Sequence, residues 1–241
     1  MMRRIAFPAV MAALLSAAGC ATRAVARAEL FATGTFAVTP ENGVWDDEYG
    51  RTSDPDDCSF TFRVIRYDDG IGVTAAVIDD RVTTDDCEPG SVSCPGWDDD
   101  NVECFFDGDH DGSKDSRSGH GLEYGGEFTL VANGAAQSDF SGQPRGFGRT
   151  WKGTASVSPR PEGGFRIDYR LWFSWECIGR RTPPRPDEDV TFGFNICVHD
   201  DDDGGRNDRA LYWTGNPALP YRDESAFGTV TLKGAAGEAR P

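Results

Sequence analysis

Apolar and polar residues alternate with a period of two through most of this chain, a pattern that indicates β-strands rather than helices. The clearest example is a hairpin in which residues 60–67 and 71–78, rich in β-branched and aromatic side chains, are joined by the turn Asp68-Asp69-Gly70. The same alternation predicts further strands over residues 102–107, 123–131, 150–157, 165–176, 190–198, 210–213 and 227–232. Gly, Pro, Asp and Asn fill the segments between them, as turns require. The series predicts an all-β fold, an antiparallel two-sheet β-sandwich of immunoglobulin-like architecture.

The N-terminal residues do not follow this pattern. Arg3 and Arg4 precede a mainly apolar run over residues 5–18. A membrane-spanning helix needs about 20 apolar residues, so the shorter run with its basic start predicts a secretory signal peptide over residues 1–19.

Cys20 directly follows the predicted signal. The segment Ser16-Ala-Ala-Gly-Cys20 resembles a bacterial lipobox, in which the cysteine is acylated and becomes the new N-terminus, although Ala17 stands where such boxes usually have Leu. We therefore predict an exported lipoprotein at the cell envelope, with residues 20–30 as a tether. The alternative is cleavage after Ala26 or Ala28, which releases a freely secreted protein.

The remaining chain is acidic. Residues 31–232 are long enough for one domain with a substantial core, and the Gly/Ala-rich residues 233–241 are predicted to be a disordered tail. The formal net charge is −16; loss of Arg3 and Arg4 with the signal lowers it by two, to −18. So acidic a surface repels nucleic acid and anionic lipid. We therefore expect no nucleic-acid partner, and membrane contact only through a lipid on Cys20.

Four motifs occur in an order that resembles the family 9 carbohydrate-binding modules. They are the hairpin end Val-Ile-Asp-Asp (residues 77–80), the Trp-x(3)-Asn-Val-Glu-x(3)-Asp segment (97–107), the Gly-Phe-Asn strand (193–195) and the final Phe-Gly-Thr-Val strand (227–230). The resemblance covers roughly residues 60 to 232. It implies a CBM9-like β-sandwich and a glycan or polysaccharide partner.

The resemblance also implies a ligand-binding site. In that family two aromatic rings clamp a terminal sugar and a carboxylate bonds its hydroxyl groups. By position, Trp97 matches the first ring, Tyr221 the second ring and Glu103 the carboxylate.

Three positions depart from the family pattern. Thr129 and Val131 stand where sugar-binding members have Arg and Asn, and Ala218 stands where an Asn precedes the second ring. Stacking on both sugar faces buries roughly 100 Å² of apolar surface, worth about 2.5 kcal/mol, whereas millimolar affinity needs about 4 kcal/mol. Either other loops supply polar contacts, or the ligand differs, or sugar binding has been lost.

An acidic segment over residues 107–115 predicts a calcium site, because its side-chain oxygens follow the first part of a calcium loop. The four predicted ligands are Asp107, Asp109, Asp111 and Asp115. Ser118 replaces the final Glu, and no helices flank the loop, so this is not an EF-hand; the alternative is a solvated acidic loop. A second acidic run, residues 200–208, is predicted to be a hairpin turn, with Arg206 or Arg209 neutralising part of it.

The cysteine count predicts disulfides. There are seven cysteines, and six remain once Cys20 is assigned to lipid, an even number typical of an exported disulfide framework. The resemblance implies a Cys177–Cys197 bridge, since these residues end strands that pair in the family. The other two proposed pairs are Cys87–Cys94, which closes a short loop before Trp97, and the remaining pair Cys58–Cys104.

Three functions follow, in order of preference. The first is non-catalytic glycan binding at the cell surface, and the second is a calcium-stabilised structural or interaction domain without sugar binding. The third is a glycoside hydrolase or its accessory subunit in carbohydrate catabolism, but with 40 acidic residues a suitable carboxylate pair arises by chance. His110, His120 and His199 are placed in loops, which argues against a nucleophile triad and leaves a haem held by two of them as a minor alternative.

Overall fold

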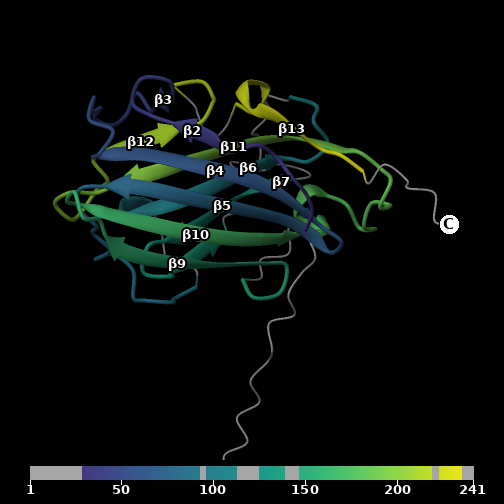
Figure 1. Ribbon diagram of the computed structural model, residues 1–241, viewed down its shortest axis with the longest axis horizontal. Coiled ribbons are helices and arrows are strands. Elements are labelled where there is room, and N and C mark those ends of the chain that lie inside the picture. Colours follow the sequence, from purple (N-terminus) through teal and green to yellow (C-terminus); the bar gives the residue numbers. More distant parts are fainter. Residues whose placement is uncertain (1–28, 93–95, 113–124, 139–146, 219–222, 235–241) are drawn as a thin grey trace, which may run out of the picture.

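Two antiparallel sheets face each other in the computed structural model of this protein (Figure 1). The structure describes residues 29–92, 96–112, 125–138, 147–218 and 223–234. The first sheet has six strands in the order β1-β4-β5-β10-β9, with β2 also paired to β4: β1 (Glu29–Ala32), β2 (Phe36–Val38), β4 (Cys58–Tyr67), β5 (Gly70–Asp79), β9 (Trp151–Pro159) and β10 (Phe165–Ser174).

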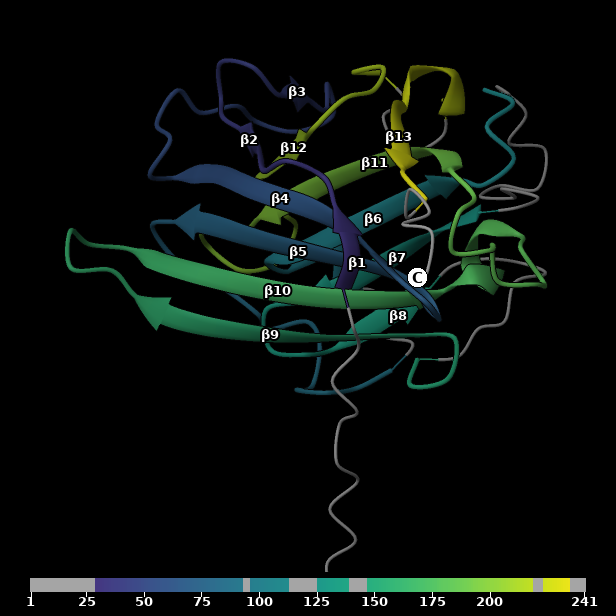
Figure 2. The same cartoon turned by 45° about the vertical axis from the view of Figure 1, so that its right-hand side comes forward.

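The second sheet has seven strands in the order β3-β12-β11-β6-β7-β8, with β13 also paired to β11. They are β3 (Val44–Trp45), β6 (Asn101–Asp107), β7 (Gly125–Val131), β8 (Ala136–Ser138), β11 (Val190–Asp200), β12 (Arg209–Tyr212) and β13 (Gly228–Leu232). Three short 3-10 helices lie in the described connections: η1 (Gly96–Asp98), η2 (Trp175–Ile178) and η3 (Glu224–Ala226). Figure 2 shows β2, β3, β12 and β13 gathered on one side of the sandwich.

The predicted all-β sandwich and its long strands are confirmed. The hairpin of β4 and β5 pairs from Cys58 opposite Asp79 to Tyr67 opposite Gly70, and the acidic run after β11 is the turn of a second hairpin with β12. Strands β1, β2, β3 and β8 were not predicted, since two to four residues are too few to display alternation. Residues 175 and 176, predicted as the end of a strand, belong to η2 instead.

Aromatic side chains join the two sheets. Phe106 of β6 and Phe128 of β7 both meet Phe173 of β10 edge to face, with ring centroids 4.9 Å apart in each pair. Burying one Phe side chain stabilises by roughly 1.5–3 kcal/mol, and an edge-to-face pair adds about 0.5–1.5 kcal/mol. These rings therefore contribute much of the apolar attraction between the sheets.

The second sheet is buried on both faces at its centre. Every residue of β6 is buried, and so are the last nine of β11. One face packs on the first sheet, and the other carries a smaller apolar cluster that includes Phe105 and Tyr212, packed against Tyr49 and Phe227. The polar side chains on this outer face are consequently shielded from water as well.

The predicted N-terminal and C-terminal segments fall mostly outside the described residues. These comprise the signal peptide (1–19), Cys20, most of the 20–30 tether and residues 235–241 of the tail. Strand β1 begins at Glu29, inside the predicted tether. Within the described ranges, no helix has the length and apolar character needed to cross a membrane.

The predicted bridge between Cys177 and Cys197 is wrong, because both are free thiols. Cys177 lies in the core between the sheets, where its thiol donates to the carbonyl oxygen of Thr150 at 3.4 Å. Cys197 faces the outer side of the second sheet, in the cluster with Phe105. The body of the sheet separates the two sulfur atoms.

The predicted Cys58–Cys104 bridge is also wrong, since both of these thiols are free and buried. Cys58 begins β4 in the first sheet, whereas Cys104 lies in the middle of β6 in the second. A free cysteine packs as a small apolar side chain, which is the role of both residues here. Cys94 lies outside the described residues and Cys87 is not among the free thiols, so that pair stays a prediction.

We expect the four free thiols to be protected from alkylation in the folded protein. Burial raises the pKa of Cys177 to about 12 and those of Cys58, Cys104 and Cys197 well above the ordinary thiol value, and a maleimide needs an accessible thiolate. Denaturant without reductant should make all four reactive, as read by peptide mass mapping. A disulfide-linked peptide joining any two of them would contradict the structure.

Candidate functional site

Three neighbouring strands bring polar side chains together on the outer face of the second sheet. In the β-ladders Glu103 of β6 lies opposite Cys197 of β11 on one side and Thr129 of β7 on the other. His199 follows Cys197 by two positions and so points to the same face. All four side chains are buried, with exposed fractions of 0 to 4%. The group is a closed polar cluster rather than an open cleft.

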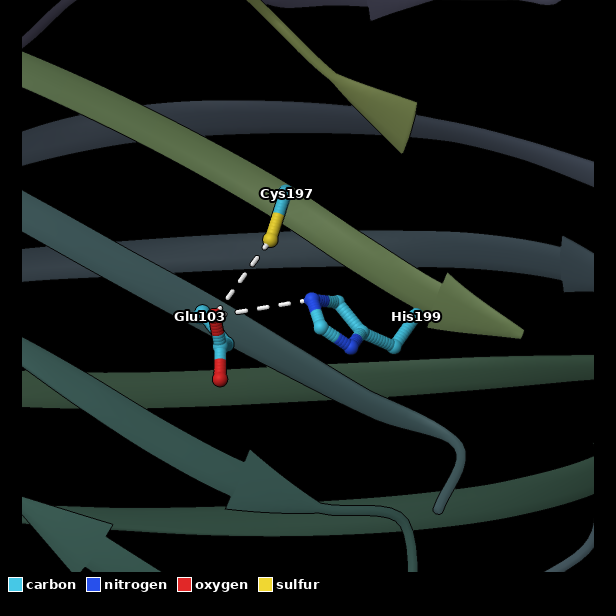
Figure 3. Close-up of side chains that lie close together, drawn as sticks. All are labelled: Glu103, Cys197 and His199. Carbon is cyan, nitrogen blue, oxygen red and sulfur yellow. Dashed lines mark hydrogen bonds and ion pairs between the residues drawn. The ribbon is translucent and has the colours of Figure 1, made fainter. Parts of the chain in front are cut away.

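Glu103 is the centre of this cluster, and both of its carboxylate oxygens have partners. Figure 3 shows its contacts with Cys197 and His199. Thr129 Oγ1 donates a hydrogen bond of 2.9 Å to Oε1. Oε2 lies 3.7 Å from the Cys197 sulfur and 3.5 Å from His199 Nε2. A sugar hydroxyl that bonds Glu103 must therefore replace or share one of these partners.

Sequence reasoning missed the contribution of His199 and Cys197. His199 lies on β11 opposite Asn101, and not in a loop as expected. The signal was available in the alternation of β11, which places residues 195, 197 and 199 on one face. Burial, followed by the negative charge of Glu103, raises the pKa of the Cys197 thiol, which disfavours a nucleophilic thiolate.

Trp97 is held beside this cluster by a rigid turn. It lies in η1 and is 40% exposed, while its carbonyl oxygen accepts a bond of 2.7 Å from His199 Nδ1. The Asn101 amide donates to the carbonyl oxygens of Gly96 and Asp99, at 2.7 and 2.9 Å, and so closes the turn. A β-carbon at Gly96 would lie only 2.3 Å from Val131 Cγ2. The turn is thus packed directly on β7, which holds the backbone that carries the Trp97 ring.

The positions that depart from the family pattern serve this packing. Thr129 bonds Glu103, and Val131 packs against Gly96 and in a small apolar cluster with Ala135. Ala218 is exposed, and its amide donates to Asn216 Oδ1 at 3.1 Å. Tyr221, the predicted second ring, lies outside the described residues.

A separate cluster of three buried carboxylates joins the ends of β5, β6 and β11. Oxygens of Asp79, Asp100 and Asp200 lie within 4.8 Å of one another. Burial raises the pKa of all three, and repulsion between neighbouring carboxylates adds to the increase for Asp79 and Asp100; that of Asp200 reaches about 7. Arg209 donates to Asp200 Oδ2 at 2.7 Å and opposes the increase there, which confirms its predicted role in the turn.

Two oxygens of this cluster lack a hydrogen bond. Asp79 Oδ1 accepts from the Arg81 amide at 2.9 Å, but Oδ2 has no partner in the described part of the chain. Asp200 Oδ1 is equally without one. When all three carboxylates are ionised, the guanidinium offsets one charge and two remain. A divalent cation such as calcium would balance these two charges with oxygen ligands, and its binding would displace the protons that the raised pKa values hold there.

The predicted calcium loop is partly assembled in the structure. Asp107 and Asp111 come within 4.8 Å of each other and of Glu224 in η3, which sequence reasoning missed. Burial and then the charges of Asp107 and Asp111 raise the pKa of Glu224 to about 8. Burial, followed by a side-chain hydrogen bond with Asp109, raises the pKa of Asp107. Asp115 lies outside the described residues.

The fold and the exposed ring beside a polar cluster define a β-sandwich of the carbohydrate-binding-module class. A model of the family described as Carbohydrate family 9 binding domain-like matches residues 37–235, so the chain belongs to this family. The resemblance predicted from the sequence is confirmed.

Solved structures share this fold. A family 9 carbohydrate-binding module from Caldicellulosiruptor kristjanssonii, in complex with cellotriose, aligns with a TM-score of 0.53 and 17% identity over 85% of this chain and 92% of that one. A candidate carbohydrate-binding protein from Bacteroides uniformis aligns with a TM-score of 0.56 and 14% identity, over 82% and 85% of the two chains. A search of curated protein sequences found no match.

We expect the free energy of unfolding to fall as pH rises from about 5 to about 8 in the presence of a chelator. An unfolded Asp titrates near pH 3.9, whereas Asp79, Asp100 and Asp200 hold protons to higher pH when folded. The folded state binds more protons in this window, so the stability present at low pH is lost as pH rises. Urea titrations across this range measure the slope, and saturating calcium should flatten it.

The matched control is Asp203→Asn, which removes one charge from an exposed position in the same turn. Asp200→Asn should make the slope shallower, whereas Asp203→Asn should leave it close to that of the wild type. Equal slopes for the two variants would contradict the assignment to the buried cluster.

Proposed function

We propose that this domain binds a glycan without cleaving it, with the ring of Trp97 stacked on one face of a sugar. The observation that carries the proposal is the exposure of Trp97 on a turn held by Asn101, Gly96 and His199. A sugar face is apolar and its rim is polar, so an ordered ring beside polar groups is suited to it. A ring on a backbone turn that is already ordered loses less conformational entropy on binding than one on an unordered loop. Membership of the family supports the same ligand class.

The ring alone does not provide useful affinity. Stacking on one sugar face buries roughly 50 Å², worth about 1.3 kcal/mol, against about 4 kcal/mol for millimolar binding. Tyr221 remains the predicted second ring, and Glu103 the predicted hydroxyl acceptor, with Thr129, Cys197 or His199 giving way to the sugar. The solved structures that share the fold include complexes with cellotriose and with glucose, so glucose and its oligomers are our first choice of ligand.

Trp97→Ala should weaken cellotriose binding about tenfold, the equivalent of the roughly 1.3 kcal/mol lost with one stacked face. Isothermal titration calorimetry measures this change, and Trp97→Phe should retain part of the affinity. Tyr67→Ala is the matched control, because Tyr67 lines a groove on the outer face of the first sheet.

Other outcomes point to different sites or functions. Binding that survives Trp97→Ala but is lost in Tyr67→Ala would move the site to that groove. No binding to any sugar on a glycan array would refute the proposal in favour of the structural alternative. Reducing-sugar release that disappears in Glu103→Gln would indicate a glycoside hydrolase or its subunit.

A second candidate function is a calcium-stabilised structural or interaction domain. The unpartnered oxygens of Asp79 and Asp200 favour it, since a hard cation would satisfy both in a buried site. The predicted loop ligands Asp107, Asp109, Asp111 and Asp115, now with Glu224, are proposed as a second calcium site. Calcium that leaves the unfolding free energy and its pH dependence unchanged would refute calcium binding at the buried cluster.

We also propose that the domain is carried at the bacterial cell envelope by a lipid on Cys20. The support is the basic, apolar and small-residue order of residues 1–20. Cys20→Ser should move the protein from the membrane fraction to the soluble fraction, as read by fractionation and immunoblot. An unchanged distribution would refute the anchor and favour cleavage after Ala26 or Ala28.

A further inference from the structure

The polar cluster on the outer face of the second sheet contains one carboxylate, one thiol and one imidazole. Ligand atoms of Glu103, Cys197 and His199 all lie within 4.8 Å of one another (Figure 3). The set differs in kind from the acidic clusters, which offer only oxygen. Thiolate and imidazole ligands favour zinc and similar metals, whereas oxygen-only sites favour calcium or magnesium.

The protonation of His199 follows from its neighbours. Nδ1 lies 2.7 Å from the carbonyl oxygen of Trp97, which can only accept, so the hydrogen is on Nδ1. Asn207 Nδ2 is 2.9 Å from the same nitrogen. Since Nδ1 then has no free lone pair, this amide instead donates to the carbonyl oxygen of Arg209, at 3.3 Å. A neutral ring then has its lone pair on Nε2, facing Glu103.

His199 Nε2 is a buried atom without a hydrogen bond from the described residues. Its separation of 3.5 Å from Glu103 Oε2 exceeds a normal hydrogen bond. A buried polar atom that is left without a hydrogen bond costs roughly 1–3 kcal/mol. A nitrogen lone pair that faces a carboxylate needs a positive charge between them, which either a proton or a metal ion can supply.

The separations match tetrahedral zinc. Zinc bonds of about 2.0–2.1 Å to nitrogen, 2.0–2.2 Å to oxygen and 2.3 Å to sulfur place N and O about 3.4 Å apart, and S and O about 3.6 Å apart. The observed distances are 3.5 Å between His199 Nε2 and Glu103 Oε2, and 3.7 Å between Cys197 Sγ and the same oxygen. Two of the three ligand separations therefore fit one ion, and the third, between His199 Nε2 and Cys197 Sγ, is within 4.8 Å.

We propose that Glu103, Cys197 and His199 form a zinc site on the outer face of the second sheet. Zinc forms a bond to the Cys197 sulfur, and the thiol proton leaves to solvent. The carboxylate and the thiolate together carry two negative charges, which the ion neutralises. Three protein ligands leave one of the four zinc positions for water or another ligand.

Neighbouring residues supply the support that zinc ligands usually have. The carbonyl oxygen of Trp97 holds His199 Nδ1, and Thr129 holds the second oxygen of Glu103. The centroids of the Tyr49 and His199 rings lie 6.2 Å apart. The guanidinium of Arg206 lies over the Tyr49 ring, with its Cζ 4.9 Å from the ring centroid. The ligands are oriented by bonds that do not involve the metal.

The test uses the full chain, stripped with a chelator and then saturated with calcium to occupy oxygen-only sites. Zinc should bind with a stoichiometry of one per chain, by calorimetry and by elemental analysis after gel filtration. Cobalt substituted for zinc should give a thiolate-to-metal charge-transfer band and the intense visible bands of a tetrahedral site. A weak, octahedral cobalt spectrum without the charge-transfer band would overturn the proposal, and this measurement needs no variant.

Variants locate the site. Cys197→Ala should abolish the charge-transfer band and weaken zinc binding at least 100-fold, and His199→Gln should weaken it similarly. Cys104→Ala is the matched control, because Cys104 is also a buried free thiol but faces the core between the sheets; it should bind zinc as the wild type does. Circular dichroism confirms that each variant is folded. Zinc affinity unchanged in folded Cys197→Ala would overturn the proposal.

Discussion

The structure depends on the burial of both faces of its two central strands, β6 and β11. Alternation along each strand sends apolar side chains between the sheets and polar side chains to the outer face. Because that outer face is also covered, its carboxylates, imidazole and amides must find partners within the protein or pay a desolvation cost. This requirement explains why Glu103, Asn101 and His199 have such specific neighbours.

Some of the acidic residues of this chain form clusters inside the fold. The turn after η1 and the end of β11 each contribute consecutive aspartates, and the two pairs meet: Asp100 with Asp200 and Asp79, and Asp99 with Asp201 and Asp85. Arg209 offsets part of this charge. The meeting of two turns from distant parts of the sequence thus produces sites where a cation would stabilise the fold, and the same turns position Trp97.

This protein shares its backbone fold with the family but differs from it in side chains around the candidate site. The sandwich matches solved relatives at 14 to 18% identity, so the backbone frame is kept while side chains vary. Thr129 and Val131 illustrate the variation, since one bonds Glu103 and the other packs against Gly96. Two of the positions at which the resemblance implied polar sugar contacts are thus packed here around the candidate site.

The sequence by itself determined the all-β class, the long strands and the family, because alternation and turn residues are local signals and the motifs retain their order. It also predicted that Trp97 and Glu103 belong to one site, and in the structure both contact His199. Only the tertiary structure decided which cysteines are free, since parity says nothing about the face of a sheet on which a sulfur lies. It likewise decided that Cys197 and His199 meet Glu103, because strand register, rather than sequence distance, sets which side chains of β6 and β11 become neighbours.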